Sequence, residues 1–185
     1  MAIELQRADK YAAQIKAELE PMCAKIEPVG SVRRRRPFPN DIDFAVLPHP
    51  GQLQAIKFRC RRGRCSIISD GGQIFSFQCG EVRFDLNFAE PATEDLVDPW
   101  PGNWGSIMML RTGSQSFNVY LVNRAKARGL RWATMIGIFR DKELIASETE
   151  EEIFAALGMR FVKPEEREID PNTVRLGIPV ADWEL

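Results

Sequence analysis

Two stretches of the chain alternate apolar and polar residues with the two-residue period of a β-strand. In residues 81–88 every second side chain is apolar, and Asp85 lies in the middle of the polar set. Residues 42–47 begin directly after Asp41, with Asp43 between apolar neighbours. Because residues two apart in a strand point to the same side, Asp41 and Asp43 are predicted to share a face, about 6–7 Å apart. The opposite face is apolar.

Other stretches carry helical or hairpin signals. Apolar residues recur at three- and four-residue steps over residues 8–25, which predicts a helix. A second helix is predicted over residues 115–128, because Ser114 is a favourable N-cap and an apolar stripe follows it. Residues 66–69 and 73–78 are strand-like and flank an Asp-Gly-Gly turn, so they are predicted to form a β-hairpin.

A stretch rich in proline and tryptophan, residues 98–104, divides the chain. Such a composition is typical of a connection rather than of a helix or a strand. We therefore expect one domain over residues 1–98 and a second over residues 99–185.

Composition limits the possible classes. The chain has 185 residues, of which 44% are hydrophobic and 28% charged, as in ordinary globular proteins. No apolar run approaches the roughly 18 residues of a membrane span, and the start lacks a signal-peptide pattern. We therefore expect a soluble intracellular protein, cytoplasmic or associated with a nucleoid or virus, with no membrane partner. In that compartment reduced thiols are favoured over a zinc site for the four cysteines: Cys23, Cys60, Cys65 and Cys79.

The formal net charge is −1, so binding to nucleic acid has to be argued from how charge is distributed. Basic residues are concentrated in residues 57–64 and, without any acidic residue, in residues 99–140. Each segment is predicted either to be a solvated basic surface or to contact a polyanion, because a duplex backbone favours such surfaces.

A Gly-Ser pair and an arginine run precede the Asp-x-Asp pair. Gly30 and Ser31 offer backbone N–H groups and a hydroxyl, and the arginines of residues 33–36 can bind phosphate. Carboxylate oxygens suit Mg²⁺, which usually takes one or two of them plus substrate phosphates. Each feature alone is also common on solvated surfaces. Their order favours a metal and phosphate site, and Asp85 can complete a set of three carboxylates that holds two metals about 3.5–4 Å apart.

These motifs together resemble a known family. Gly-Ser-Val-Arg-Arg at 30–34, Asp-Ile-Asp at 41–43 and Val-Arg-Phe-Asp at 82–85 look like the palm of the family X DNA polymerases, the polymerase beta family. Thr-Gly-Ser-Gln-Ser-Phe-Asn at 112–118 resembles the thumb of the same family. The resemblance covers about residues 8–168. It implies an α+β fold, with a nucleotidyltransferase palm (a mixed sheet with helices on one face) followed by a small α+β thumb.

The resemblance also implies a function and its residues. It implies a DNA-directed DNA polymerase that fills gaps by adding dNTPs to a primer 3′-OH, with pyrophosphate release. The implied cofactor is a pair of Mg²⁺ ions, for which Mn²⁺ can substitute, and the implied partners are gapped or primer–template DNA and dNTP, bound by a monomer. The implied catalytic residues, which also bind the metals, are Asp41, Asp43 and Asp85. The implied nucleotide-binding residues are Gly30, Ser31, Arg33, Arg34, Thr112, Gly113 and Asn118. The expected DNA-binding residues are Arg59, Arg61, Arg111, Arg124, Lys126, Arg128 and Arg131.

The chain departs from the family pattern at several positions. Leu110 and Arg111 stand where the family has an aromatic pair that helps to exclude ribonucleotides. Val122 stands where relatives often have a basic residue that touches the template. Nothing before the palm corresponds to a lyase domain, so we expect no lyase activity. Two alternatives stay open: a template-independent nucleotidyltransferase acting on a DNA or RNA 3′ end, and a DNA-end-binding protein without catalysis.

Overall fold

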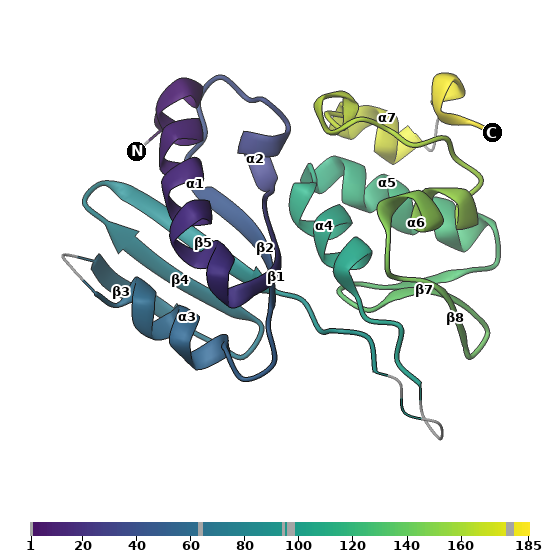
Figure 1. The fold of residues 1–185 in the computed structure, drawn as a ribbon. Coiled ribbons are helices and arrows are strands. Elements are labelled where there is room, and N and C mark those ends of the chain that lie inside the picture. The colour runs from purple at the N-terminus through teal and green to yellow at the C-terminus, as the bar shows by residue number, and fades with distance from the viewer. Residues whose placement is uncertain (1, 63–64, 94, 96–98, 177–179) are drawn as a thin grey trace. The chain divides into compact units, whose positions relative to one another are not determined.

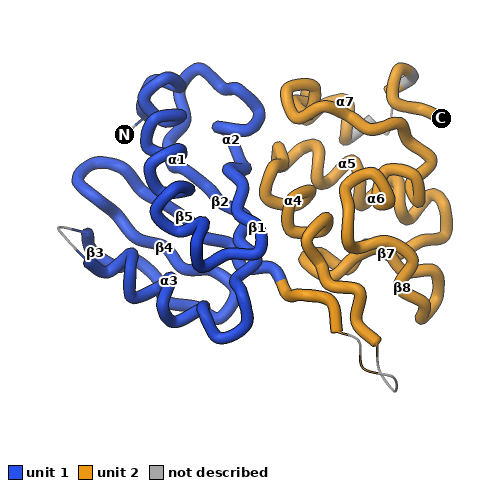
Figure 2. The backbone as a smooth tube through the Cα atoms, in the orientation of Figure 1, with its two compact units in different colours: residues 1–89 blue, residues 90–185 orange. Residues whose placement is uncertain are grey.

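The chain folds into two compact units, residues Met1–Ala89 and Glu90–Leu185 (Figure 2). We describe a computed structural model, which covers residues 2–62, 65–93, 95, 99–176 and 180–185. The boundary predicted between residues 98 and 99 involves a position outside the described residues.

The first unit is built on a mixed five-stranded sheet in the order β1-β2-β5-β4-β3 (Figure 1). β2 and β5 are parallel, and the other neighbouring strands are antiparallel. The predicted hairpin is present as β3 and β4, and both alternating stretches form strands as predicted. The strands are β1 (Cys23–Pro28), β2 (Ile42–Pro48), β3 (Cys65–Asp70), β4 (Ile74–Cys79) and β5 (Val82–Phe88).

Helices α1 (Leu5–Leu19) and α3 (Leu53–Cys60) cover one face of this sheet (Figure 1). The apolar side chains of β2 and β5 form the core below them, and Phe44 and Leu86 are fully buried there. This arrangement confirms the predicted mixed sheet with helices on one face. It leaves the opposite face of β2 and β5 to their polar residues.

The predicted helix over residues 8–25 is too long at its C-terminal end. α1 stops at Leu19, a 3₁₀ turn η1 (Glu20–Met22) follows, and β1 begins at Cys23. Pro21 in the 3₁₀ turn has no N–H to continue the helical hydrogen bonds. Residues 23–25 therefore pair with β2 as a strand.

The second unit contains helices, a three-stranded sheet in the order β6-β7-β8, and a separate core. Ser114 accepts a hydrogen bond from the N–H of Phe117 at 3.4 Å, as predicted for an N-cap. The elements are α4 (Trp104–Thr112), α5 (Gln115–Ala127), β6 (Arg131–Ala133), β7 (Gly137–Arg140), β8 (Glu143–Ala146), α6 (Glu150–Ala156), η2 (Pro164–Glu166), α7 (Pro171–Leu176) and η3 (Ala181–Trp183). No helix in the described part of the chain is long and apolar enough to span a membrane.

The expectation of four free thiols is wrong for two cysteines. Cys65 and Cys79 are direct partners in the β3–β4 ladder and form a disulfide. Pairing of the strands places the two side chains opposite one another, which an argument from compartment does not foresee. Cys23 and Cys60 are free and buried. Burial raises the pKa of the Cys23 thiol to about 11 and that of the Cys60 thiol to about 12.

Candidate active site

The parallel pairing of β2 with β5 brings the predicted carboxylates together. Asp43 and Asp85 are direct partners in the ladder, so their side chains project from the same face of the sheet. Asp41 lies immediately before β2. Burial raises the pKa of the Asp41 carboxyl, and the nearby negative charge of Asp85 raises it further. The three predicted catalytic residues therefore form one acidic group on the face of the sheet away from the helices.

Gly30 lies against this group and begins the short helix α2 (Gly30–Arg33). Its φ of +62° is a left-handed conformation that favours glycine, and a β-carbon here would collide with the Asp43 carboxylate. The N–H of Val29 donates to the carbonyl of Asp43 at 2.8 Å, which fixes α2 beside β2. The predicted Gly-Ser turn is thus a single helical turn that lies against the Asp43 carboxylate.

The arginine run continues from α2 into a braced loop. Arg33 is the last residue of α2 and Arg34 is its C-cap, and both are partly buried. Arg35 donates to the Asp9 carboxylate at 2.9 Å, which ties the loop to α1. The N–H of Ile3 and that of Leu5 donate to backbone carbonyls of the loop at 2.8 and 3.0 Å. Ser31, Arg33 and Arg34 therefore lie on one anchored segment beside the carboxylates.

Arg83 is a site residue that the sequence analysis did not select. Its Nε and Nη2 donate to the two carboxylate oxygens of Asp85 at 3.0 and 2.9 Å. These hydrogen bonds, and then the charges of Asp85, Asp41 and Asp43, raise the pKa of Arg83. The signal was present in the sequence, because Arg83 lies two residues before Asp85 on a strand and so shares its face.

Two buried polar residues support Asp85, which is only 9% exposed. Asn87 donates its amide N–H groups to the carbonyls of Phe44 and Asp85 at 3.1 and 3.4 Å. Ser76 of β4 is the ladder partner of Asp85 on the other side and is buried. The sheet therefore holds the backbone on both sides of Asp85.

The donor set fits a hard divalent cation, because carboxylate oxygens are the ligands that Mg²⁺ prefers. Burial and, after it, the charge of Asp85 raise the pKa of the Asp41 carboxyl, and the charge of Arg83 acts in the opposite direction. In the conformation described, however, Arg83 occupies both oxygens of Asp85. Within the described residues, no group of three or more His, Cys, Asp or Glu side chains is arranged to hold a metal. A cation at Asp85 would therefore compete with Arg83 for the carboxylate oxygens.

In the second unit, three predicted nucleotide-binding residues lie together at the junction of α4 and α5. Thr112 ends α4 and is fully buried, and Gly113 follows it with a φ of +61°. Asn118 donates from Nδ2 to the carbonyl of Leu110 at 2.9 Å. Its Oδ1 is buried and has no hydrogen-bond partner among the residues described. The acceptor capacity of this oxygen is therefore not used by the described residues.

The predicted DNA-binding residues of this unit have different surroundings. Arg124 donates to the carbonyls of Leu157 and Gly158 at 2.9 and 3.0 Å and pairs with Glu184, so it joins parts of the fold. Arg131 stacks on the Phe139 ring with its guanidinium carbon 4.3 Å from the ring centre. Arg111 approaches the sulfur of Met135, with 3.8 Å between Nη2 and Sδ. Lys126 and Arg128 are exposed at the end of α5 and just after it.

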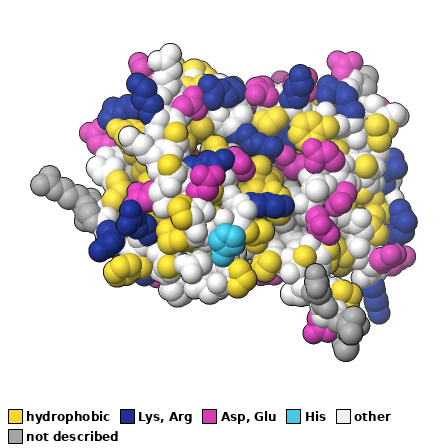
Figure 3. All heavy atoms as spheres, viewed as in Figure 1, with side chains coloured by type: hydrophobic (Ala, Val, Ile, Leu, Met, Phe, Trp, Pro, Cys, Tyr) yellow, Lys and Arg dark blue, Asp and Glu magenta, His cyan; other side chains and the backbone are white. Residues whose placement is uncertain are grey.

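The basic segment of the first unit is occupied by ion pairs within the chain. Lys57 is 5% exposed and donates to Asp70 at 2.7 Å, Arg61 pairs with the same carboxylate, and Arg59 donates to Glu18 at 2.6 Å. Arg64 lies outside the described residues. On the face that carries α1 and α3, positive and negative side chains are intermixed rather than gathered in one basic patch (Figure 3).

Comparisons with known proteins support the fold. The family model of the DNA polymerase beta thumb matches residues 107–168. The fold is similar to Leishmania infantum polymerase beta in a ternary P/T complex, with a TM-score of 0.73, 19% identity, and coverage of 91% of this chain and 77% of the other. It is similar to the same enzyme in a ternary gap complex, with a TM-score of 0.73, 18% identity, and coverage of 91% and 71%. The comparison with curated protein sequences gave no match.

The resemblance read from the sequence is thus confirmed for the fold, and its thumb motifs lie within the matched segment. The chain therefore has a fold similar to that of polymerase beta, and residues 107–168 of its second unit match the polymerase beta thumb.

Proposed function

We propose that the chain is a DNA-directed DNA polymerase of the family X type, which adds dNTPs to a primer 3′-OH at gaps and primer–template ends. The observation that carries the proposal is the parallel pairing of β2 with β5, which groups Asp43 and Asp85 beside Asp41. The thumb match over residues 107–168 supports nucleic acid as the substrate class. The protein is proposed to act as a monomer.

The proposed reaction is an in-line displacement at phosphorus. The primer 3′-OH attacks the α-phosphorus of the dNTP, and pyrophosphate leaves. Asp85 accepts the hydroxyl proton, which requires that Arg83 first release its carboxylate. Ser31 and Arg34 hold the triphosphate, since a hydroxyl and a guanidinium suit phosphate oxygens.

Asp41, Asp43 and Asp85 are the residues proposed to hold the metal ions, with Mg²⁺ as the natural ion and Mn²⁺ as a substitute. Once bound there, two Mg²⁺ ions would stabilise the charge that develops on the attacking and leaving oxygens. The protein's own part is to keep the carboxylates on one rigid sheet face. Gly30 contributes by leaving space for the Asp43 carboxylate.

In the second unit, Thr112, Gly113 and Asn118 are proposed to bind the nucleotide. The buried Oδ1 of Asn118 is the acceptor for a base or sugar donor. The proposed DNA contacts here are Arg111, Lys126, Arg128 and Arg131. Arg124, Arg59 and Arg61 are left out of this surface, because their guanidinium groups are bonded within the chain.

A template-independent nucleotidyltransferase is the second candidate. The observation that favours it is the position of Val122, which packs against the core of the second unit. It cannot offer the template a charged contact. Equal incorporation of matched and mismatched nucleotides would favour this candidate over the first.

The test is primer extension across a one-nucleotide gap with Mg²⁺, each of the four dNTPs being offered singly. The proposal expects incorporation of the templated nucleotide, and a loss of at least a hundredfold in Asp85→Asn. The matched control is Asp141→Asn, an exposed residue with a φ of +53° that asparagine also adopts. Equal activity of Asp85→Asn and the wild type would contradict the proposal, as would absence of incorporation by the folded wild-type protein.

A further inference from the structure

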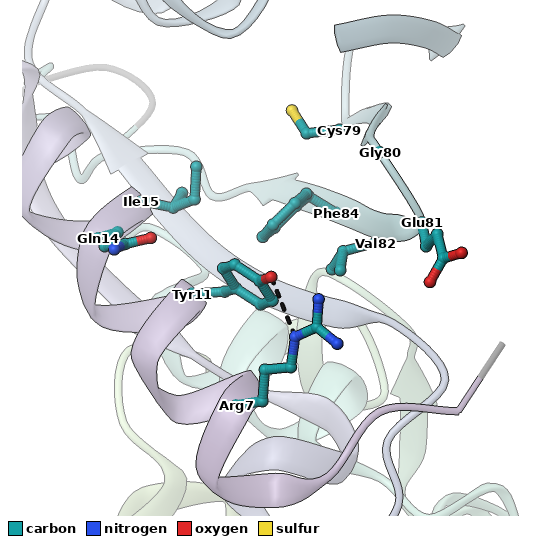
Figure 4. Close-up of a pocket in the computed structure, with 9 residues that line it drawn as sticks. All are labelled: Arg7, Tyr11, Gln14, Ile15, Cys79, Gly80, Glu81, Val82 and Phe84. Atoms are coloured by element: carbon teal, nitrogen blue, oxygen red, sulfur yellow. Dashed lines mark hydrogen bonds between the residues drawn. The ribbon is translucent and has the colours of Figure 1, made fainter. Parts of the chain in front are cut away.

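A cavity of about 440 Å³ opens between α1 and the β4–β5 hairpin of the first unit (Figure 4). This volume lies within the roughly 300–1,000 Å³ range of small-molecule sites. Phe84 lines the cavity, and it alternates along β5 with Arg83 and Asp85. The cavity is therefore on the opposite face of the sheet from the candidate active site, and the two sites are distinct.

The walls of the cavity come from one stripe of a helix and one hairpin. Arg7, Tyr11 and Gln14 are three and four residues apart on α1, so they face the cavity together. Val82 and Phe84 of β5 are 5% and 3% exposed and give it an apolar floor. Figure 4 shows Glu81 on the hairpin side, across from α1.

The rim carries a donor and an acceptor on different walls. Arg7 Nε donates to the Tyr11 hydroxyl at 3.0 Å, which positions the guanidinium and leaves its terminal nitrogens directed towards the side of Val82 and Glu81 (Figure 4). The hydrogen bond to Tyr11, together with the charge of Glu81 across the cavity, raises the pKa of Arg7. In the described structure Glu81 forms no hydrogen bond with Arg7. The mouth thus has N–H donors on the helix wall and a carboxylate on the hairpin wall.

We propose that this cavity binds a guanine base. Guanine is planar and carries, along one edge, the O6 acceptor next to the N1–H and N2–H donors. O6 accepts from Arg7, the two N–H groups donate to the Glu81 carboxylate, and the ring lies on the Val82 and Phe84 floor beside Tyr11. Adenine presents an amino donor where guanine has O6, so it sets a donor against Arg7 and leaves both groups unsatisfied.

Two sources supply this chemistry: a free guanine nucleotide, and an unpaired guanine in single-stranded nucleic acid. The first experiment uses guanosine and adenosine with the chain of 185 residues, by calorimetry in EDTA. A nucleoside has no phosphate, which removes the phosphate contacts proposed for Ser31 and Arg34, and the cavity variants described below distinguish this cavity from the candidate active site. We expect guanosine to bind at least tenfold more tightly than adenosine, and to shift the ring signals of Tyr11 in NMR spectra. Only two tyrosines are present in the chain, which makes assignment direct.

Variants locate the site. Arg7→Ala and Glu81→Ala change exposed side chains, so the fold is retained, and each is expected to weaken guanosine binding at least tenfold. Lys10→Ala is the control, because Lys10 is exposed on the same helix but does not line the cavity. Equal affinity for guanosine and adenosine, or guanosine binding that both variants leave unchanged, would overturn the proposal.

A second arm compares GMP with a single-stranded thymidine heptamer that contains one central guanine. Tighter binding of the heptamer assigns the site to nucleic acid, and tighter binding of GMP assigns it to a free nucleotide. This assignment holds only if Arg7→Ala weakens the binding of whichever ligand binds more tightly to the wild type. Failure of Arg7→Ala to do so would overturn the proposal for both sources.

Discussion

Among single residues, Arg83 places a positive charge beside the carboxylates of the candidate active site. It forms two hydrogen bonds to Asp85 and lies close to the charges of Asp41 and Asp43. A bidentate arginine–carboxylate pair is a strong, charge-assisted contact. A divalent cation bound by Asp85 has to compete with this pair.

Removal of Arg83 should therefore strengthen metal binding. For Arg83→Ala we expect half-maximal stabilisation by Mg²⁺ at a concentration several-fold lower than for the wild type. Arg83→Lys should lie between them, because it keeps the charge and loses the bidentate geometry. The measurement is the thermal midpoint as a function of Mg²⁺ concentration. An unchanged Mg²⁺ midpoint in Arg83→Ala would show that the guanidinium and the cation do not compete.

The Cys60 thiol gives stability a dependence on alkaline pH. Burial raises its pKa to about 12, whereas an unfolded chain gives about 8.5. Between these values the folded state retains a proton that the unfolded state has lost. The contribution is therefore complete below about pH 8.5 and is lost as the pH rises towards 12, by at most about 1.4 kcal/mol per pH unit.

Urea unfolding at pH 8.5 and pH 10 tests this expectation. The wild type should lose on the order of 1–2 kcal/mol more stability between the two pH values than Cys60→Ala does. Cys23 remains in both proteins and cancels in the comparison. Equal losses in the two proteins would mean that the thiol titrates alike in the folded and unfolded states.

At the scale of elements, the alternating strands were predictable and the helix end was not. β2 and β5 have one buried face each, so their two-residue period follows directly from burial. α1 and β1 follow one another with only η1 between them, and the apolar spacing continues through that turn. The parallel register that sets Asp43 opposite Asp85 depends on contacts between distant segments, which local patterns do not encode.

The basic segment of residues 57–64 is a second case in which contacts between distant segments could not be predicted from the local pattern. Lys57, Arg59 and Arg61 form a run that predicted either a solvated surface or a polyanion contact. Instead, Lys57 and Arg61 converge on Asp70 of β3, and Arg59 joins α3 to α1 through Glu18. The local sequence could not predict these ion pairs, because the acidic partners lie in other elements.

In the second unit, a buried ion pair joins α6 to the segment after η2. Arg167 is fully buried and donates to Glu150 at 2.6 Å and to the carbonyl of Val162 at 3.0 and 2.8 Å. Its guanidinium also lies within 5.6 Å of the ring centres of Phe117, Phe154 and Phe161. The carbonyl of Arg167 accepts from the Ser114 hydroxyl at 2.8 Å, which connects this pair to the start of α5.

Glu150→Ala should therefore destabilise the second unit by about 3–5 kcal/mol, because it leaves a buried charge without its carboxylate. The control is Glu151→Ala, an exposed neighbour in the same helix, for which we expect less than about 0.5 kcal/mol. Tryptophan fluorescence during urea unfolding measures both. A small effect of Glu150→Ala would show that the carbonyl and the aromatic rings alone satisfy Arg167.

At the scale of the whole molecule, the division into two units has a thermodynamic consequence. Each unit has its own core cluster, and no residue belongs to both. The residues that can report on unfolding are also divided between the units. All four tryptophans lie in residues 90–185, and the two free thiols, Cys23 and Cys60, lie in residues 1–89. Tryptophan fluorescence and thiol reactivity therefore report on different units.

We expect the two probes to respond to different core substitutions, since a large-to-small change in a core costs about 2–5 kcal/mol. Leu86→Ala should lower the urea midpoint of thiol exposure and leave the fluorescence midpoint unchanged. Phe154→Ala, fully buried in the other unit, should do the reverse. If either variant shifted both midpoints equally, the two units would unfold as one cooperative body. Separate responses would mean that the carboxylate site of the first unit can be altered without loss of the thumb. Thiol exposure then shows whether the first unit of Asp85→Asn is still folded, which separates a loss of chemistry from a loss of folding.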